Sequence, residues 1–110
     1  IYSFAECLPF KNNIFDLIVF DGSFDHLLDW KGALIEAKRC LSKNGRIVIS
    51  VLNWNDNENL IKDLFHFHHF SSSEIIMFMK NKGFKLLDQT FSPWKDEYFR
   101  NVSTLMFQKN

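Results

Sequence analysis

This sequence has no excess of positive or negative charge. Its 13 Lys and Arg residues balance its 13 Asp and Glu residues, and its isoelectric point lies near 7.1. A nucleic-acid-binding domain usually carries a broad basic surface, so this balance predicts no nucleic-acid partner. Hydrophobic residues make up 46% of the chain and charged residues 24%, as in globular proteins, which excludes a disordered chain.

Long apolar runs and cysteine are scarce as well. No apolar run approaches the roughly 20 residues that span a bilayer, so no membrane partner is expected. The two cysteines, Cys7 and Cys40, are far apart and lack the spacing of metal ligands, which predicts no metal site and a reducing, cytoplasmic location. No signal-peptide pattern follows Ile1. We therefore expect the chain to begin either after processing or inside a larger gene product.

Phenylalanine, by contrast, is abundant, with 13 among the 110 residues. A chain of this length suits one domain and buries roughly two-thirds of its unfolded surface, so its core is modest. With so many large aromatic side chains, we expect some of them to line a pocket or an interface.

Two short apolar runs predict a pair of buried strands. They are residues 15–20, FDLIVF, and 46–51, RIVISV, and their Val and Ile content is typical of parallel strands. The segment between them predicts a helix with Asp29 as its N-cap and Asn44-Gly45 as a left-handed stop. A strand, a helix and a strand in this order form a right-handed crossover unit. The inner face of the helix is expected to carry Leu34, Ala37, Cys40 and Leu41.

The second half of the chain predicts two helices and two strands. One helix covers 57–69, and a second begins with a capping box at 71–74 and ends at Gly83. Residues 84–90 and 98–108 read as strands, and the final strand closes the sheet in the antiparallel direction.

The position of a binding site follows from this order of elements. Ligands of open α/β sheets bind beyond the carboxyl ends of the strands. This rule points to residues 20–27 and 51–56, together with the opening loop of the chain. The architecture alone does not give the reaction.

Most of the chain carries a set of short motifs in a fixed order. They comprise Ala-Glu-x-Leu-Pro-Phe, a loop, Phe-Asp before a strand, a His, and a helix that ends in Arg-x-Leu-x-x-x-Gly. The matching residues are Ala5, Glu6, Leu8, Pro9, Phe10, Phe15, Asp16, His26, Arg39, Leu41 and Gly45. This pattern resembles the S-adenosylmethionine-dependent methyltransferases of class I, which are Rossmann-like, and among them the methyltransferase type 11-like subgroup.

The resemblance implies an α/β fold that forms part of a Rossmann-like methyltransferase sheet. The strands would be equivalent to the family's strands 4-5-7-6, with an antiparallel last strand and with helices flanking the sheet. Residues 1–110 would form the C-terminal portion of a methyltransferase domain, without its N-terminal cofactor-binding half. The implied cofactor is S-adenosyl-L-methionine, and the implied partner is a small-molecule methyl acceptor that the sequence does not identify.

The resemblance also implies contacts with the adenine ring of the cofactor. Ala5 and Glu6 would lie beside that ring, and Leu8 would pack close by. Many relatives have Asp where this chain has Phe4, and a Phe side chain cannot accept the adenine amino hydrogen bond. On the residues alone, Leu-Pro-Phe is equally well explained as a turn that enters a core strand.

The end of the first expected strand would approach the methionine part of the cofactor. Phe20 and Asp21 lie at this end, where Asp21 could receive the ammonium group and Gly22 would let the main chain come near the cofactor; a plain turn is the alternative. Histidines implied to lie on the substrate side are His26, His66 and His69. His26 is also explained as a structural hydrogen-bonding residue and the other two as part of an ordinary helix end. The cluster around them lacks the i, i+4 spacing of a helical zinc motif.

Two elements of such a domain do not occur in the 110 residues. There is no glycine-rich turn after a first strand and no second strand that ends in a ribose-binding acid. We therefore expect this chain alone to bind the cofactor poorly and to be inactive. Strand 15–20 would have an open edge, which predicts self-association through it or pairing with an N-terminal half.

Three functions remain open from the sequence. The first is methyl transfer, with this chain as the C-terminal part of a larger enzyme. The second is a non-catalytic, methyltransferase-like module for binding or oligomerisation. The third is another nucleotide-dependent α/β enzyme, which would leave Leu-Pro-Phe and the following Phe-Asp unexplained.

Overall fold

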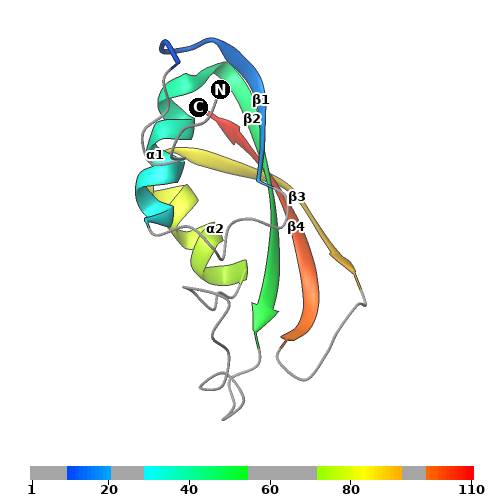
Figure 1. Ribbon diagram of the computed structural model, residues 1–110. Helices are drawn as coiled ribbons and strands as arrows, with labels where there is room; N and C mark the ends of the chain where they lie inside the picture. The colour runs from blue at the N-terminus through cyan, green and yellow to red at the C-terminus, as the bar shows by residue number, and fades with distance from the viewer. Residues whose placement is uncertain (1–9, 21–28, 55–71, 93–98) are drawn as a thin grey trace.

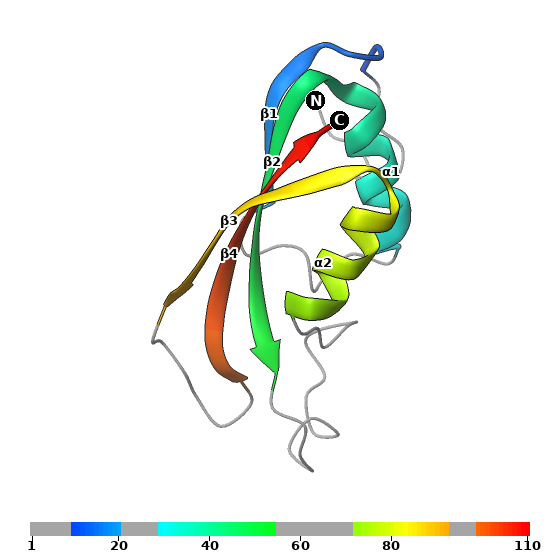
Figure 2. The same ribbon diagram turned by 180° about the vertical axis from the view of Figure 1, so that it is seen from behind.

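Six regular elements follow one another along the chain. The computed structural model describes residues 10–20, 29–54, 72–92 and 99–110. The elements are β1 (Phe15–Phe20), α1 (Trp30–Cys40), β2 (Leu41–Trp54), α2 (Ser72–Asn81), β3 (Phe84–Ser92) and β4 (Phe99–Lys109). The strands form one four-stranded sheet, and both helices lie against the same face of it (Figures 1 and 2).

The strand order confirms the predicted fold class. The order across the sheet is β1-β2-β4-β3. β1 runs parallel to β2, and β4 lies antiparallel between β2 and β3. The last strand of the chain therefore sits inside the sheet, as the family's 4-5-7-6 arrangement requires.

The start of α1 follows the sequence prediction. The Asp29 carboxylate accepts a hydrogen bond from the Gly32 main-chain N–H at 3.0 Å, which is the N-cap contact. A Cβ on Gly32 would lie 2.4 Å from the Asp29 Oδ2 atom. Glycine at this position therefore leaves room for the capping carboxylate.

The end of α1 differs from the prediction, which placed a left-handed stop at Asn44-Gly45. The helix ends at Cys40, and the chain continues in an extended conformation at Leu41. Asn44 does have a left-handed φ of 63°, but a Cβ on Gly45 would lie 2.8 Å from the Ser42 carbonyl oxygen. The pair therefore shapes the first residues of β2, because the main chain folds back on itself there.

The C-terminal elements agree with the sequence prediction. α2 is followed by Gly83, whose φ of 88° is favoured by glycine. The strands predicted at 84–90 and 98–108 are β3 and β4. The helix predicted at 57–69 lies outside the described residues. No described helix is long and apolar enough to cross a membrane.

The core lies between the helices and one side of the sheet, which we call the covered face. Along each central strand every second residue points to this side, and those with 0% exposure include Ile47, Ile49, Val51, Ser103, Leu105 and Phe107. The inner face of α1 is buried as predicted, through Leu34, Ala37, Cys40 and the following Leu41.

The opposite side of the sheet, which we call the open face, carries no described helix (Figures 1 and 2). Leu17 and Val19 of β1 point to it and are 55% and 54% exposed. In register with Val19 are Val48 on β2 and Met106 on β4, both half-buried. β1 was predicted to be covered on both faces, but in the described residues it is covered on one.

Candidate functional site

The carboxyl ends of the parallel strands define one edge of the sheet. β1 ends at Phe20, which is in register with Ile49 on β2, and β2 continues to Trp54. Because the two strands are neighbours and parallel, their carboxyl ends point to the same edge of the sheet (Figure 1). We call this the carboxyl edge, and it is where open α/β sheets bind ligands.

Of the predicted site residues, Phe20 lies within the described part of the chain. Its side chain is 9% exposed and belongs to the hydrophobic core. The remaining candidates lie outside the described residues and stay predictions; they are Ala5, Glu6, Leu8, Asp21, Gly22, His26, His66 and His69.

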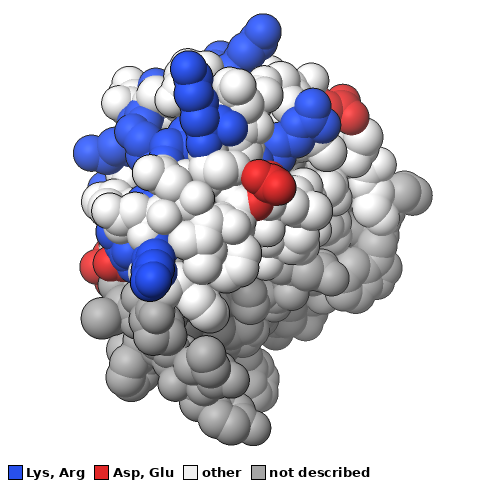
Figure 3. Space-filling model, turned by 90° about the horizontal axis from the view of Figure 1, so that it is seen from above, with Lys and Arg blue, Asp and Glu red and all other residues white. Residues whose placement is uncertain are grey.

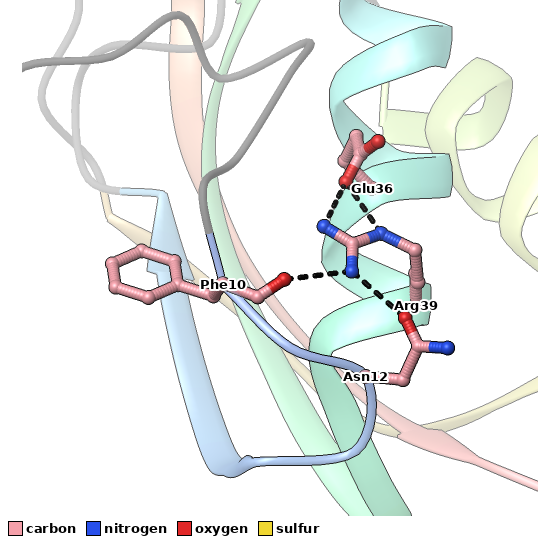
Figure 4. Close-up of polar contacts among 4 residues, drawn as sticks. All are labelled: Phe10, Asn12, Glu36 and Arg39. Atoms are coloured by element: carbon pink, nitrogen blue, oxygen red, sulfur yellow. Dashed lines mark hydrogen bonds and ion pairs between the residues drawn. The ribbon is translucent and has the colours of Figure 1, made fainter.

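Arg39 fixes the end of the opening loop against α1 (Figure 4). One of its terminal nitrogens donates to the Phe10 carbonyl oxygen at 2.7 Å and to Asn12 Oδ1 at 2.8 Å. Its other donors bind the Glu36 carboxylate, at 2.8 Å from Nε and 2.6 Å from the second terminal nitrogen. The guanidinium fork thus joins a helix to the residue that follows Leu-Pro in the motif. Arg39 was quoted as part of the motif, and the structure gives it this positioning role.

A tight turn carries the chain from this anchor into β1. The Asn13 and Ile14 N–H groups donate to the carbonyl oxygens of Arg39 and Cys40 at 3.0 and 2.9 Å, and Asn13 has a φ of 56°. Asn tolerates this left-handed conformation better than most side chains do. The polar Lys-Asn-Asn between Phe10 and Phe15 is therefore explained by turn geometry and by capture of the last carbonyls of α1.

A cavity of about 240 Å³ lies between the first turn of α1 and α2. Trp30 and Phe78 contribute aromatic rings whose centroids are 5.1 Å apart, and the Lys31 ammonium lies 5.4 Å from the Trp30 ring. Its lining residues are Trp30, Lys31, Glu74, Met77, Phe78 and Asn81. Phe20, the predicted site residue that lies within the described part of the chain, is not among them.

Metal-binding groups do not gather in the described residues. Those residues contain no cluster of three His, Cys, Asp or Glu side chains that could hold an ion. Cys40 is buried in α1 and is a free thiol.

Part of the chain is similar in sequence to a family of methyltransferase domains. Residues 3–49 match a family model described as a methyltransferase domain. The protein YafE of Escherichia coli, which is uncharacterized, is 32% identical over 80 residues, and this stretch is 64% of the present chain and 39% of YafE. The matched stretch thus spans less than half the length of that relative.

The fold is shared with solved structures of the same class. An S-adenosylmethionine-dependent methyltransferase of Methanosarcina mazei superimposes with a TM-score of 0.80 at 15% identity, over 97% of this chain and 65% of that one. The [4+2]-cyclase SpnF superimposes with a TM-score of 0.77 at 15% identity, over 97% of this chain and 55% of that one. The resemblance to a class I methyltransferase domain of the type 11-like kind is confirmed, and the cyclase shows that the fold hosts other reactions.

Proposed function

We propose that this chain, as a relative of the class I methyltransferases, forms the downstream half of a site that transfers a methyl group from S-adenosylmethionine. The observation that carries the proposal is the family match over residues 3–49. That span includes the opening loop, α1, the first part of β2 and β1, whose last residue, Phe20, lies at the carboxyl edge.

The opening loop is the proposed adenine contact. Arg39 holds the last residue of this loop, Phe10, to α1. This anchor fixes the point beside α1 from which we propose that the preceding motif extends. Ala5 and Glu6 would then face the adenine, with Leu8 beside it. Because Phe4 stands where many relatives have Asp, we assign acceptance of the adenine amino group to Glu6.

The methionine part of the cofactor is proposed to lie beyond β1. Asp21 follows the last residue of this strand, so its carboxylate would receive the cofactor's ammonium group. The side chain of Phe20 is in the core. Its main chain and that of Gly22 are therefore the groups proposed to approach the ligand.

The acceptor is proposed to be a small molecule, with His26, His66 and His69 on its side of the site. S-adenosylmethionine supplies an activated methyl group, which a nucleophile on the acceptor attacks at carbon. The protein's part in such a displacement is mainly to hold the acceptor in line and to exclude water. We name no catalytic base.

The rest of the cofactor site is proposed to come from an N-terminal half. The 110 residues contain neither a glycine-rich turn nor a ribose-binding acid at a strand end. Within the described sheet β1 pairs with β2 on one side, and its outer edge bears no described strand. We propose that a strand of the N-terminal half pairs with this edge, and that the chain self-associates through it when that half is missing.

A second candidate function is a non-catalytic module that binds a partner through the same edge. Phe4 favours it, since the usual adenine acceptor is missing there. The cyclase SpnF also shows that the fold does not by itself dictate methyl transfer.

Calorimetry with S-adenosylhomocysteine separates these functions. We would titrate it into the 110-residue chain and into the protein that the coding sequence specifies when it is read from its start codon. The proposal expects binding by the longer protein and little or none by the 110 residues. Tight binding by the 110 residues alone would refute the two-halves arrangement, and no binding by the longer protein would refute methyl transfer in favour of the module.

Matched variants test the assigned contact at β1. In the longer protein, Asp21→Asn should weaken binding of S-adenosylhomocysteine by about tenfold or more, because it removes the charge that pairs with the ammonium group. Asp88→Asn is the control, since Asp88 lies exposed on β3 and accepts from the neighbouring Gln89 N–H. Equal affinities of the two variants would remove Asp21 from the site.

A further inference from the structure

Although the charges of the whole chain balance, basic and acidic residues lie in different segments of it. Residues 10–20, 29–54, 72–92 and 99–110 contain 11 Lys and Arg against 5 Asp and Glu, whereas the rest of the chain contains 2 against 8. The sheet and its helices are therefore basic, and most acidic residues lie in the segments between them. Net charge alone misses this arrangement.

The basic residues gather at the end of the molecule opposite the carboxyl edge, as Figure 3 shows from above. This end is formed by the 10–14 turn, the last turns of α1 and α2, the start of β2 and β3, and the end of β4 (Figure 1). We call it the basic end. Its cations are Lys11, Lys38, Arg39, Lys43, Arg46, Lys80, Lys82, Lys85 and Lys109, and its carboxylates are Asp16 and Glu36.

Three of these cations hold the basic end together. Lys109 Nζ donates to the carbonyl oxygens of Lys38 and Leu41 at 2.8 and 2.7 Å, so the end of β4 is tied to the end of α1. Lys38 Nζ donates to the Lys82 carbonyl oxygen at 2.5 Å. Arg39 is paired with Glu36. These side chains complement the carbonyl ends of the helices, and a structural role accounts for them.

Lys80 lies in the last turn of α2, where a cation suits the helix end, and Lys82 lies over the Phe78 ring at 5.7 Å. The remaining four cations have no such explanation. Lys11, Lys43, Arg46 and Lys85 are exposed, and none of them has an ion pair with a described carboxylate. Asp16, the remaining acid of this end, accepts a hydrogen bond from the Ser42 hydroxyl at 2.6 Å. Arg46 and Lys85 lie in one row across the sheet, since both are in register with Gln108 on β4.

We propose that the basic end binds the phosphate backbone of a double-stranded nucleic acid. Besides the cations, this end presents amide side chains, among them Asn12, Asn44 and Gln108, and Lys, Arg, Asn and Gln are the residues that contact phosphates. A protein partner would be anchored by an exposed aromatic or Arg-rich pocket, and a membrane by inserted apolar side chains. Among the described residues the exposed aromatic side chain Phe91 lies at the far end of β3.

This inference departs from the expectation drawn from the balanced composition, because that expectation counted charge without its position. It does not rest on methyl transfer, since the basic end lies opposite the carboxyl edge. The described aromatic side chains beside the 10–14 turn, Phe10 and Phe15, are half-buried and pack edge-to-face on each other with ring centroids 5.0 Å apart. They offer no open ring for a base to stack on, so the described surface suits a duplex contacted through its backbone better than a single strand. Binding is therefore expected to be independent of sequence and strongly dependent on salt.

Fluorescence anisotropy with labelled 20-base-pair duplexes of RNA and of DNA tests the proposal on the 110-residue chain. If Lys11, Lys43, Arg46 and Lys85 each neutralise one phosphate, the logarithm of the affinity falls with the logarithm of salt concentration with a slope of roughly −3 to −4. Lys43→Gln and Lys85→Gln should each reduce that slope by about 1. At about 50 mM salt each should weaken binding about tenfold, the counterion-release contribution of a single contact.

Lys31→Gln is the matched control, because it removes the same charge from α1 near its other end, where Lys31 lies over the Trp30 ring. It should leave affinity and slope unchanged. Equal losses in Lys31→Gln and Lys43→Gln would overturn the proposal, and so would the absence of duplex binding at low salt. Stronger binding of labelled polyglutamate or of anionic vesicles than of either duplex would also overturn it, in favour of an acidic protein or a membrane. Circular dichroism verifies that each variant is folded.

Discussion

The covered face and the open face belong to the same four strands, yet their side chains meet different surroundings. On the covered face Ile49 and Leu105 are in register and both are fully buried beneath the helices. On the open face Leu17 and Val19 are more than half exposed. Because the strand period is two, successive residues of one strand point to opposite faces, as half-buried Val48 and buried Ile49 do on β2.

This difference shows which apolar side chains stabilise the described part of the chain without a partner. Burial of apolar area on the covered face supplies the main favourable term for folding. Apolar side chains on the open face contribute little until something covers them, and exposed apolar patches of this kind mark interfaces. The comparison therefore separates the residues that hold the fold from those that await a partner.

Truncation of one leucine on each face should give the largest difference in free energy of unfolding. Leu105→Ala leaves a cavity in the packed core and should cost about 2–5 kcal/mol in free energy of unfolding. Leu17→Ala, which removes the same atoms at a site that is 55% exposed, should cost less than about 1 kcal/mol. Urea denaturation followed by circular dichroism measures both. Equal losses would mean that the two faces are equally covered in solution.

Removal of the Arg39 side chain tests whether the packing of α1 on the covered face depends on its contacts with the opening loop. Arg39→Ala removes charge-assisted hydrogen bonds to Phe10 and Asn12 and the ion pair with Glu36, and should cost about 1–3 kcal/mol. Amide hydrogen exchange at residues 12–14 should accelerate with it. Lys31→Ala on the same helix is the control. Unchanged exchange in Arg39→Ala would show that the turn is held without the anchor.

Variants of Asp29, the N-cap of α1, test how much the start of this helix contributes to stability. Asp29→Ala leaves the Gly32 N–H without its 3.0 Å acceptor and should cost about 1 kcal/mol. Asp29→Asn, which keeps an acceptor oxygen, should recover most of that loss. The melting temperatures of the two variants and the parent protein give the comparison. A full loss in Asp29→Asn would mean that charge, and not the hydrogen bond, is what matters.

A charge on the open face should have the smallest effect on stability and a clear effect on association. Val19 is 54% exposed, so Val19→Lys should change the free energy of unfolding by less than about 0.5 kcal/mol. Size-exclusion chromatography with light scattering should show that it lowers self-association of the 110-residue chain, since lysine protects open strand edges. A parent chain that is already monomeric at high concentration would contradict the open-edge proposal.

Local patterns in the sequence predicted most of the described fold. The buried positions of α1, its Asp29 cap and the four strands followed from periodicity and capping rules. The inserted position of β4 followed from the family resemblance, because register between distant strands has no local signal. The helix end was placed too late, since Asn44 and Gly45 have turn chemistry that here serves the start of β2.

The site was less accessible to sequence reasoning. The role of Arg39 required three contacts from residues separated by up to 29 positions, and only its place in the motif hinted at it. The basic end was missed because its cations come from six separate segments and are cancelled in the total by acidic residues elsewhere. Both features depend on which segments meet in space, and composition carries no such information.

Photochemical cross-linking tests the central claim, that the carboxyl edge and the opening loop cradle the methyl donor. Tritiated S-adenosylmethionine would be irradiated with the protein read from its start codon, and the labelled peptides would be identified by mass spectrometry. The account predicts label within residues 1–10 or 20–28, with competition by S-adenosylhomocysteine. Competed label confined to α2 and β3, residues 72–92, would contradict it.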